Sequence, residues 1–120
     1  MEAIFIELPA FERHRAEHLD DEGFRTLQQT LLTYPYVGNV IPGTGGLRKM
    51  RFAAPQRHKG KRGGIRVIYY GWEAGYQFWL FTLYGKDLQD DLSPLQRQAI
   101  KHLLEREYLT RTTHATQHFH

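Results

Sequence analysis

The chain has 120 residues, no cysteine and a formal net charge of +3. This length suits one domain with a hydrophobic core, and an aromatic content of 13% is too high for a disordered chain. The lack of cysteine excludes disulfides and thiolate chemistry and fits a reducing compartment. Because no apolar run approaches the ~20 residues that cross a bilayer, and the N-terminus lacks the pattern of a signal peptide, we expect a cytoplasmic protein without membrane contacts.

The first third of the chain predicts a short strand followed by two helices. Residues 3–7 alternate weakly, as a strand does, and Pro9 suits the first turn of a helix over about 10–19. Asp20 is a suitable N-cap for a second helix. Its apolar stripe at helical spacing is Phe24, Leu27, Leu31 and Tyr34. Pro35 ends this helix, because a residue before proline avoids the α region.

The middle of the chain is purely basic, since no Asp or Glu occurs between Glu22 and Glu73. Residues 43–70 carry eight of the chain's 16 Lys and Arg residues. They are Arg48, Lys49, Arg51, Arg57, Lys59, Lys61, Arg62 and Arg66. Without local neutralisation these cations produce a positive field that attracts an anion, although an ordinary solvated surface is the alternative interpretation.

This basic region is patterned as a β-hairpin, with strands over 47–54 and 65–70 around a turn-rich loop. Period two in the first strand gives Met50 and Phe52 one face, which we expect to pack on the core. The other face carries Leu47, Lys49, Arg51 and Ala53. Lys49 and Arg51 are therefore predicted to lie side by side, pointing away from that core.

The last third predicts a buried strand and a capped helix. Residues 76–84 are apolar on both faces, which indicates a central position in the sheet. After an acidic loop, Ser93 is the predicted N-cap, followed by proline at the first helical position, and Gln96 completes a capping box. The predicted apolar stripe of this helix is Leu95, Ala99, Ile100, Leu103 and Leu104.

The polar C-terminal stretch shows no periodicity, so we expect a domain over 1–109 and a disordered tail over 110–120. Its histidines, His114, His118 and His120, lack the spacing and supporting acids of a metal site. The sequence predicts no metal and no cofactor.

Several segments together resemble the HigB-type branch of the RelE/ParE toxin superfamily. They are GTGGLRK at 43–49, GKRGGIRVIYY at 60–70, LYGK at 83–86 and LSPLQR at 92–97. The resemblance implies an α+β fold, with a small antiparallel sheet, two N-terminal helices and a C-terminal helix. It implies the toxin of a type II toxin-antitoxin system, a ribosome-dependent endonuclease that cleaves mRNA and inhibits translation. The implied partners are the ribosome, mRNA and a cognate antitoxin of the helix-turn-helix kind, which alone would connect the toxin to operator DNA.

The resemblance assigns the catalytic site to Lys49, Arg51, Arg66, Tyr84 and Lys86. RNA can be cut without metal when its own 2′-hydroxyl attacks phosphorus, provided that charge is stabilised and protons are moved. Arg66 is the best phosphate clamp, with an ordinary strand arginine as the alternative, and Arg51 is a second charge stabiliser that cannot act as a base. Lys49 and Lys86 are candidates for proton transfer, and Tyr84 either assists it or simply packs on the sheet.

Further cations are predicted to bind the RNA backbone without reading bases. They are Arg48, Arg57, Lys59, Lys61 and Arg62. His58 in the same loop is a weaker acid-base candidate. Two other functions stay open: a non-catalytic nucleic-acid-binding module, which needs only the basic patch, and a toxin that acts on gyrase.

Overall fold

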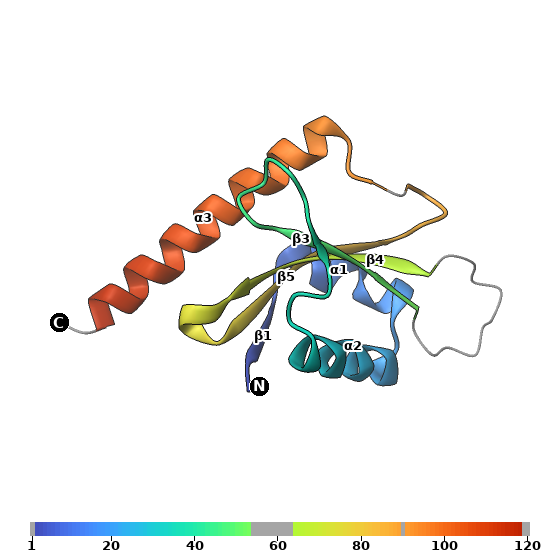
Figure 1. Cartoon of the computed structure of the whole chain (residues 1–120), viewed down its shortest axis with the longest axis horizontal. Helices are drawn as coiled ribbons and strands as arrows, with labels where there is room; N and C mark the ends of the chain where they lie inside the picture. Colours follow the sequence, from blue (N-terminus) through green and yellow to red (C-terminus); the bar gives the residue numbers. More distant parts are fainter. Residues whose placement is uncertain (1, 54–63, 90, 119–120) are drawn as a thin grey trace.

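The computed structural model describes residues 2–53, 64–89 and 91–118 (Figure 1). The elements in chain order are β1 (Ile4–Glu7), α1 (Pro9–His18), α2 (Asp21–Thr33), β2 (Asn39–Val40), β3 (Arg48–Phe52), β4 (Ile65–Trp72), a 3₁₀ turn (Glu73–Gly75), β5 (Gln77–Gly85) and α3 (Pro94–His118). None of the helices in these described ranges is long and apolar enough to cross a membrane.

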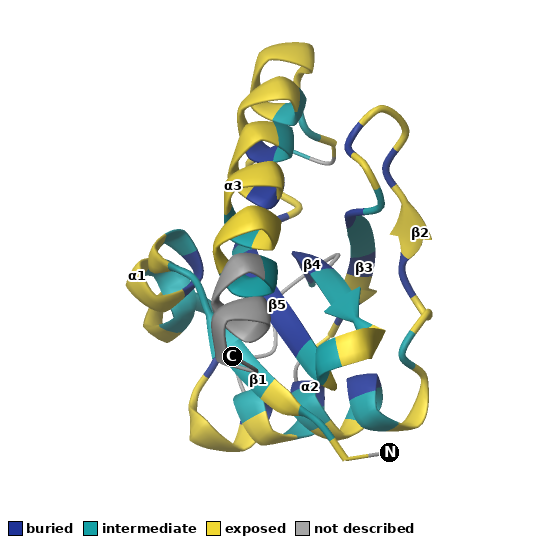
Figure 2. Ribbon diagram, turned by 90° about the vertical axis from the view of Figure 1, so that its left-hand side faces the viewer, coloured by how far each residue is buried: buried dark blue, intermediate teal, exposed yellow. Residues whose placement is uncertain are grey.

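The strands form one five-stranded sheet in the order β1-β5-β4-β3-β2. The pairs β2–β3, β3–β4 and β4–β5 are antiparallel, as expected, whereas β1 runs parallel to β5 and makes the sheet mixed. Helices α1 and α2 cover one face and α3 crosses the other (Figures 1 and 2). The predicted α+β class, with two N-terminal helices and a C-terminal helix, is confirmed.

The caps of the first helices follow the sequence closely. The Gly23 N–H donates to Asp20 Oδ1 over 2.7 Å, so Asp20 is the N-cap of α2. The helix ends at Thr33, directly before Tyr34-Pro35. Tyr34 itself was wrongly included in the apolar stripe, because its side chain is exposed where the chain leaves the helix.

The face of the sheet under α1 and α2 holds the first hydrophobic core. It contains Phe11, Leu19, Leu27, Leu31, Met50, Phe52, Ile65, Val67, Tyr69, Phe78, Leu80 and Leu83. The prediction that Met50 and Phe52 pack on the core is therefore confirmed.

A second core lies between the opposite face and α3. It contains Ile41, Leu47, Ile68, Trp79, Phe81, Ile100 and Leu104. The face of β3 that carries Leu47 was predicted to point away from the core of Met50 and Phe52, and it does, but Leu47 is fully buried in this second core. The physical reason is that α3 covers this face, so both faces of the sheet have apolar surface to bury.

A β-bulge changes which face the residues of β5 occupy. The register between β4 and β5 shifts after Ile68, so Ile68 pairs with Thr82 whereas Tyr69 pairs with Leu80. One extra residue on β5 allows both Phe81 and Tyr84 to pack with the second core, although their positions differ in parity.

Helix α3 begins as predicted. The Gln96 N–H donates to the Ser93 hydroxyl over 3.1 Å, and the Ser93 N–H donates to Gln96 Oε1 over 2.8 Å. The predicted apolar stripe was partly wrong, because Leu95 and Leu103 are exposed while Ile100 and Leu104 are buried.

The helix also continues past Leu109 to His118, where the sequence suggested a disordered tail. Local contacts support this extension. Arg111 forms an ion pair with Glu107 and lies over the ring of Trp79, and the Thr112 hydroxyl donates to the Tyr108 carbonyl.

Candidate functional site

Three of the predicted site residues lie in one row across three adjacent strands. In the sheet register Arg51 of β3 pairs with Arg66 of β4, and Arg66 pairs with Tyr84 of β5. Ile65 and Val67 belong to the first core, so Arg66 between them points to the α3 side. Because neighbouring strands are ~4.8 Å apart, the row of Arg51, Arg66 and Tyr84 spans ~10 Å.

Burial differs sharply along this row. Arg66 is only 3% exposed, whereas Arg51 is exposed and Tyr84 is half-buried. Arg66 Nη1 lies 3.5 Å from the Ile65 carbonyl oxygen, a long contact that holds the guanidinium close to its own strand. A buried guanidinium interacts with an anion more strongly than an exposed one, because water screens it less.

Lys49 lies on the same side of β3, two residues before Arg51, and pairs in register with Ile68. Its ammonium forms an ion pair with the carboxylate of Asp91, which follows β5 in the acidic loop. The Lys49 side chain is 15% exposed and the Asp91 side chain 70%, so the carboxylate approaches from the solvent side. The basic region is therefore not wholly uncompensated, as its sequence had indicated, and the contact could not be foreseen because the two residues are 42 positions apart.

Lys86 lies just beyond the end of β5. Its backbone N–H donates to the Gly64 carbonyl over 3.2 Å, which places it beside the start of β4, and its side chain is exposed. Gly64 has a φ of +61°, and a Cβ atom there would lie 2.6 Å from the Phe52 carbonyl oxygen. Glycine is therefore required where the chain enters β4, one element that positions Arg66.

Arg48 lies away from the row, on the opposite face of β3. Its guanidinium is 4.9 Å from the ring centre of Tyr36 and donates to the Gly38 carbonyl over 2.7 Å. The other predicted RNA-binding cations fall outside the described residues. These are Arg57, Lys59, Lys61 and Arg62, and His58 lies with them.

The described ranges offer no group of three His, Asp or Glu side chains that could hold a metal ion. The side chains of the C-terminal histidines, His114, His118 and His120, are outside the described structure.

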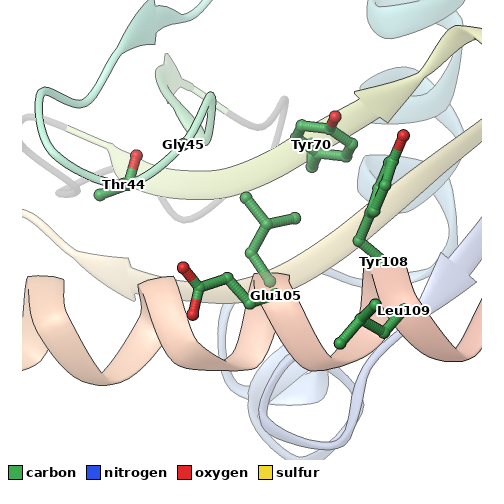
Figure 3. Close-up of a pocket in the computed structure, with 7 residues that line it drawn as sticks. Thr44, Gly45, Tyr70, Glu105, Tyr108 and Leu109 are labelled. Carbon is green, nitrogen blue, oxygen red and sulfur yellow. The ribbon is translucent and has the colours of Figure 1, made fainter.

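A cavity of about 480 Å³ lies near the middle of α3, on the same face of the sheet as the row. It is lined by Thr44, Gly45, Tyr70, Leu104, Glu105, Tyr108 and Leu109. Figure 3 shows Tyr70 and Tyr108 at one end and the Thr44–Gly45 loop at the other. Burial, and secondarily the nearby Tyr108, raises the pKa of the Tyr70 hydroxyl, which keeps it neutral. This mainly apolar cavity, with Glu105 as its one lining charge, does not suit a nucleic-acid phosphate.

The GTGG segment of the sequence shapes the wall of this cavity. The buried Thr44 hydroxyl donates to the Ile41 carbonyl over 2.7 Å and accepts from the Leu47 N–H over 3.2 Å. The motif therefore holds the loop that leads into β3.

Comparison with known proteins identifies the fold. No protein-family model matches the chain. A mutant of E. coli toxin RelE in the free state is similar with a TM-score of 0.51 and 13% identity, over 75% of this chain and 90% of that chain. The isolated E. coli RelE toxin is similar with a TM-score of 0.49 and 13% identity, over 85% and 99% of the two chains. The superposition on the free mutant, taken with the order of helices and strands, shows that this chain has the fold of E. coli toxin RelE.

Proposed function

We propose that this protein is the toxin of a type II toxin-antitoxin system and cleaves mRNA on the ribosome. The observation that carries the proposal is the row of Arg51, Arg66 and Tyr84 across three strands of a RelE-like sheet. Two guanidiniums at fixed spacing beside a phenol provide charge stabilisation and a hydroxyl at one place. Lys49 and Lys86 add ammonium groups on the two sides of this row.

In this proposal the RNA backbone lies along the row with the reacting phosphate at Arg66. The attacking group is the RNA 2′-hydroxyl. Its oxygen forms the new bond to phosphorus while the bond to the 5′-oxygen breaks, which leaves a 2′,3′-cyclic phosphate and a 5′-hydroxyl. Arg66 and Arg51 stabilise the added negative charge on the phosphoryl oxygens.

Two proton transfers complete the reaction, one from the 2′-hydroxyl and one to the leaving 5′-oxygen. Tyr84 within the row and Lys49 and Lys86 beside it are the groups that can transfer them. Lys49 meets the RNA only when a phosphate replaces the Asp91 carboxylate at its ammonium group. The reaction needs no metal in this scheme, because the cations take the role of charge stabilisation.

The decisive experiment incubates the purified protein with ribosomes programmed with a defined mRNA and analyses the ends of the fragments. We expect a 2′,3′-cyclic phosphate on one fragment and a 5′-hydroxyl on the other. A 2′-deoxy substitution at the cleaved nucleotide should abolish cleavage, since it removes the attacking group. The same mRNA without ribosomes is the control.

Other outcomes would assign a different function. RNA binding without cleavage would indicate a non-catalytic nucleic-acid-binding module, and inhibition of DNA supercoiling would indicate a toxin that acts on gyrase. Cleavage that persists on the 2′-deoxy mRNA would overturn the proposed mechanism. If expression of this protein stops cell growth, growth that is restored by co-expressing a helix-turn-helix protein from the neighbouring reading frame would identify the antitoxin.

A further inference from the structure

Arg97 is a cation in the first turns of α3 that is not among the predicted site residues. Its backbone N–H donates to the Ser93 carbonyl within the first turn of the helix. Its side-chain Nε–H is shielded from solvent and has no hydrogen-bond partner among the described residues. A shielded donor on a charged group without an acceptor is costly, and an acceptor supplied by a ligand removes that cost.

Helical spacing puts Arg97 on the side of α3 that faces the sheet. It lies three residues before Ile100 and seven before Leu104, and both of these are buried in the second core. Residues three and seven apart share one side of a helix. Arg97 therefore extends the buried stripe toward the N-terminus of α3.

The direction of α3 places this residue at the end of the sheet that carries the row. The Tyr108 ring contacts Trp72 at the far end of β4, and Ile100 and Leu104 pack in one cluster with Ile68. Going back from Tyr108 to Arg97 covers ~16 Å along a helix. Going back from Trp72 to Arg66 covers ~20 Å along a strand. Figure 1 shows α3 and β4 running in the same direction. Arg97 lies near the start of α3 and Arg66 near the start of β4, so the two residues occupy corresponding ends of these elements.

A second contact ties the start of α3 to the same end of the sheet. Asp91, three residues before the helix, forms its ion pair with Lys49. Lys49 is two residues from Arg51 on the face that α3 covers. The helix start is therefore fixed near the cations of β3 by a contact that is independent of the helical stripe.

We infer that Arg97 binds a phosphate of the RNA from the helix side of the site, opposite the strand cations. This inference rests on the proposed function and adds a binding residue to it. A guanidinium is always protonated and presents several donors in one plane, which matches phosphate oxygens. RNA would then lie between β3–β4 and the start of α3, held from both sides. Arg97 acts in RNA binding, whereas Arg66 acts on the reacting phosphate.

The test compares Arg97→Leu, Arg97→Lys and the control Arg106→Leu, which removes an exposed arginine from the same helix. Single-turnover mRNA cleavage on programmed ribosomes is measured against protein concentration at several KCl concentrations. For Arg97→Leu we expect the half-saturating concentration to rise about tenfold or more, with the maximal rate changed less than about twofold. A plot of the logarithm of the half-saturating concentration against the logarithm of the KCl concentration should have a slope smaller by about 0.7 than in the wild type, because one phosphate contact is lost. Arg106→Leu should match the wild type.

The inference would be overturned if Arg97→Leu left the half-saturating concentration unchanged, or if Arg97→Leu and Arg106→Leu raised that concentration equally. If Arg97→Leu does not fold, as judged by its thermal melt, Arg97→Lys decides. It keeps the charge but loses Nε, and we expect a smaller rise in the half-saturating concentration, whereas an unchanged value would count against the contact. If the wild type cleaves and only Arg97 proves irrelevant, the proposed function stands. If the wild type does not cleave at all, the proposed function itself has failed.

Discussion

At the scale of single residues, the notable feature is a guanidinium that the fold buries in a strand between two core residues. Arg66 is 3% exposed, with Ile65 and Val67 on either side turned into the first core. The sequence indicated this burial through the apolar neighbours of Arg66. It also gave both helix caps, Asp20 and Ser93, because a cap depends only on residues within one turn.

Contacts between distant residues could not be predicted in the same way. The partner of Lys49 is Asp91, and the orientation of Arg97 depends on how α3 crosses the sheet. Only the spacing of Arg97 from Ile100 signals its position, and that signal is weak without knowing which stripe of the helix is buried. The predicted stripe included Leu95 and Leu103, which are exposed.

Replacing Arg66 tests the centre of the row. Arg66→Met keeps much of the buried stem and removes the charge, so the variant should remain folded in a thermal melt. Its maximal cleavage rate on programmed ribosomes should fall about 100- to 1,000-fold, the usual cost of removing one preorganised donor. Arg66→Lys should recover part of the rate, because an ammonium cannot make the planar two-point contact. Wild-type activity in Arg66→Met would rule out the phosphate clamp, and the exposed Arg25→Met is the matched control.

Asp91 should weaken RNA binding, because its carboxylate forms an ion pair with the Lys49 ammonium and so competes with an RNA phosphate for it. Asp91→Asn removes the negative charge while keeping the side-chain shape. We expect the half-saturating concentration for cleavage to fall by about two- to fivefold, in keeping with the energy of a solvent-exposed ion pair. Glu17→Asn, which removes an exposed carboxylate on α1, is the control. A rise in half-saturation for Asp91→Asn would mean that Asp91 positions Lys49 for RNA instead of competing with it.

At the scale of elements, strands and helices were predictable where one periodicity dominates. The interior position of β5 followed from its apolar residues on both faces, and it lies between β1 and β4. The face of Tyr84 could not be predicted by counting along β5, because the bulge after Ile68 changes the parity. Likewise, the burial of Leu47 in the second core could not be predicted, since nothing local reveals that α3 covers that face.

The entry into β4 depends on Gly64, and Gly64→Ala should be strongly destabilising. A Cβ atom would lie 2.6 Å from the Phe52 carbonyl oxygen, at a φ of +61°. Gly43→Ala is the matched control, because Gly43 has a φ of +77° but nothing within 4 Å of an added Cβ atom. We expect Gly43→Ala to cost about 1 kcal/mol of unfolding free energy and Gly64→Ala clearly more, as measured in urea. Equal costs would show that backbone strain alone matters at Gly64.

Tyr69 connects β4 to the segment that leads into β2, and its removal should have a pH-dependent effect. Its hydroxyl donates to the Pro35 carbonyl over 2.9 Å and accepts from the Gly38 N–H over 3.0 Å. Tyr69→Phe should lower the unfolding free energy at pH 7 by about 1–3 kcal/mol, because a buried donor and acceptor lose their partner.

Burial raises the pKa of the Tyr69 hydroxyl above its ordinary value of 10.0. The unfolded chain therefore loses this proton first, so the stabilisation is complete below pH 10 and declines as the pH rises further. The difference in unfolding free energy between the wild type and Tyr69→Phe should therefore narrow above pH 10. Tyr34→Phe, which changes an exposed tyrosine, should have the same unfolding free energy as the wild type throughout. A constant difference up to pH 11 would contradict the shifted pKa.

At the scale of the whole molecule, the sheet has a core on each face, and Lys49, Arg51 and Arg66 lie toward one end of the face that α3 covers. The acidic residues lie before Gly23 and after Gly71 in the sequence, so the central hairpin is the main source of positive charge. Such a field increases the rate of association with a negatively charged partner.

On the proposed function, we expect the antitoxin to bind through an acidic segment that covers part of the row of Arg51, Arg66 and Tyr84. Its affinity, measured by calorimetry with the co-purified antitoxin, should fall about tenfold or more between 50 and 200 mM KCl. Arg51→Ser should make this dependence weaker, whereas Arg25→Ser on α2 should not. Salt-independent binding would indicate an antitoxin that acts away from the row, for example by blocking entry to the ribosome.

The shortness of β2 has a consequence for self-association. Among the described residues, β2 pairs only with Arg48 and Lys49, so the outer backbone edge of β3 from Met50 to Phe52 has no strand beside it. Exposed strand edges recruit further chains, and a charge on the edge discourages this. Arg51 is the charge at this position. An apolar replacement of Arg51 would thus open an edge to aggregation, so a loss of activity in such a variant has meaning only once light scattering shows a monodisperse sample.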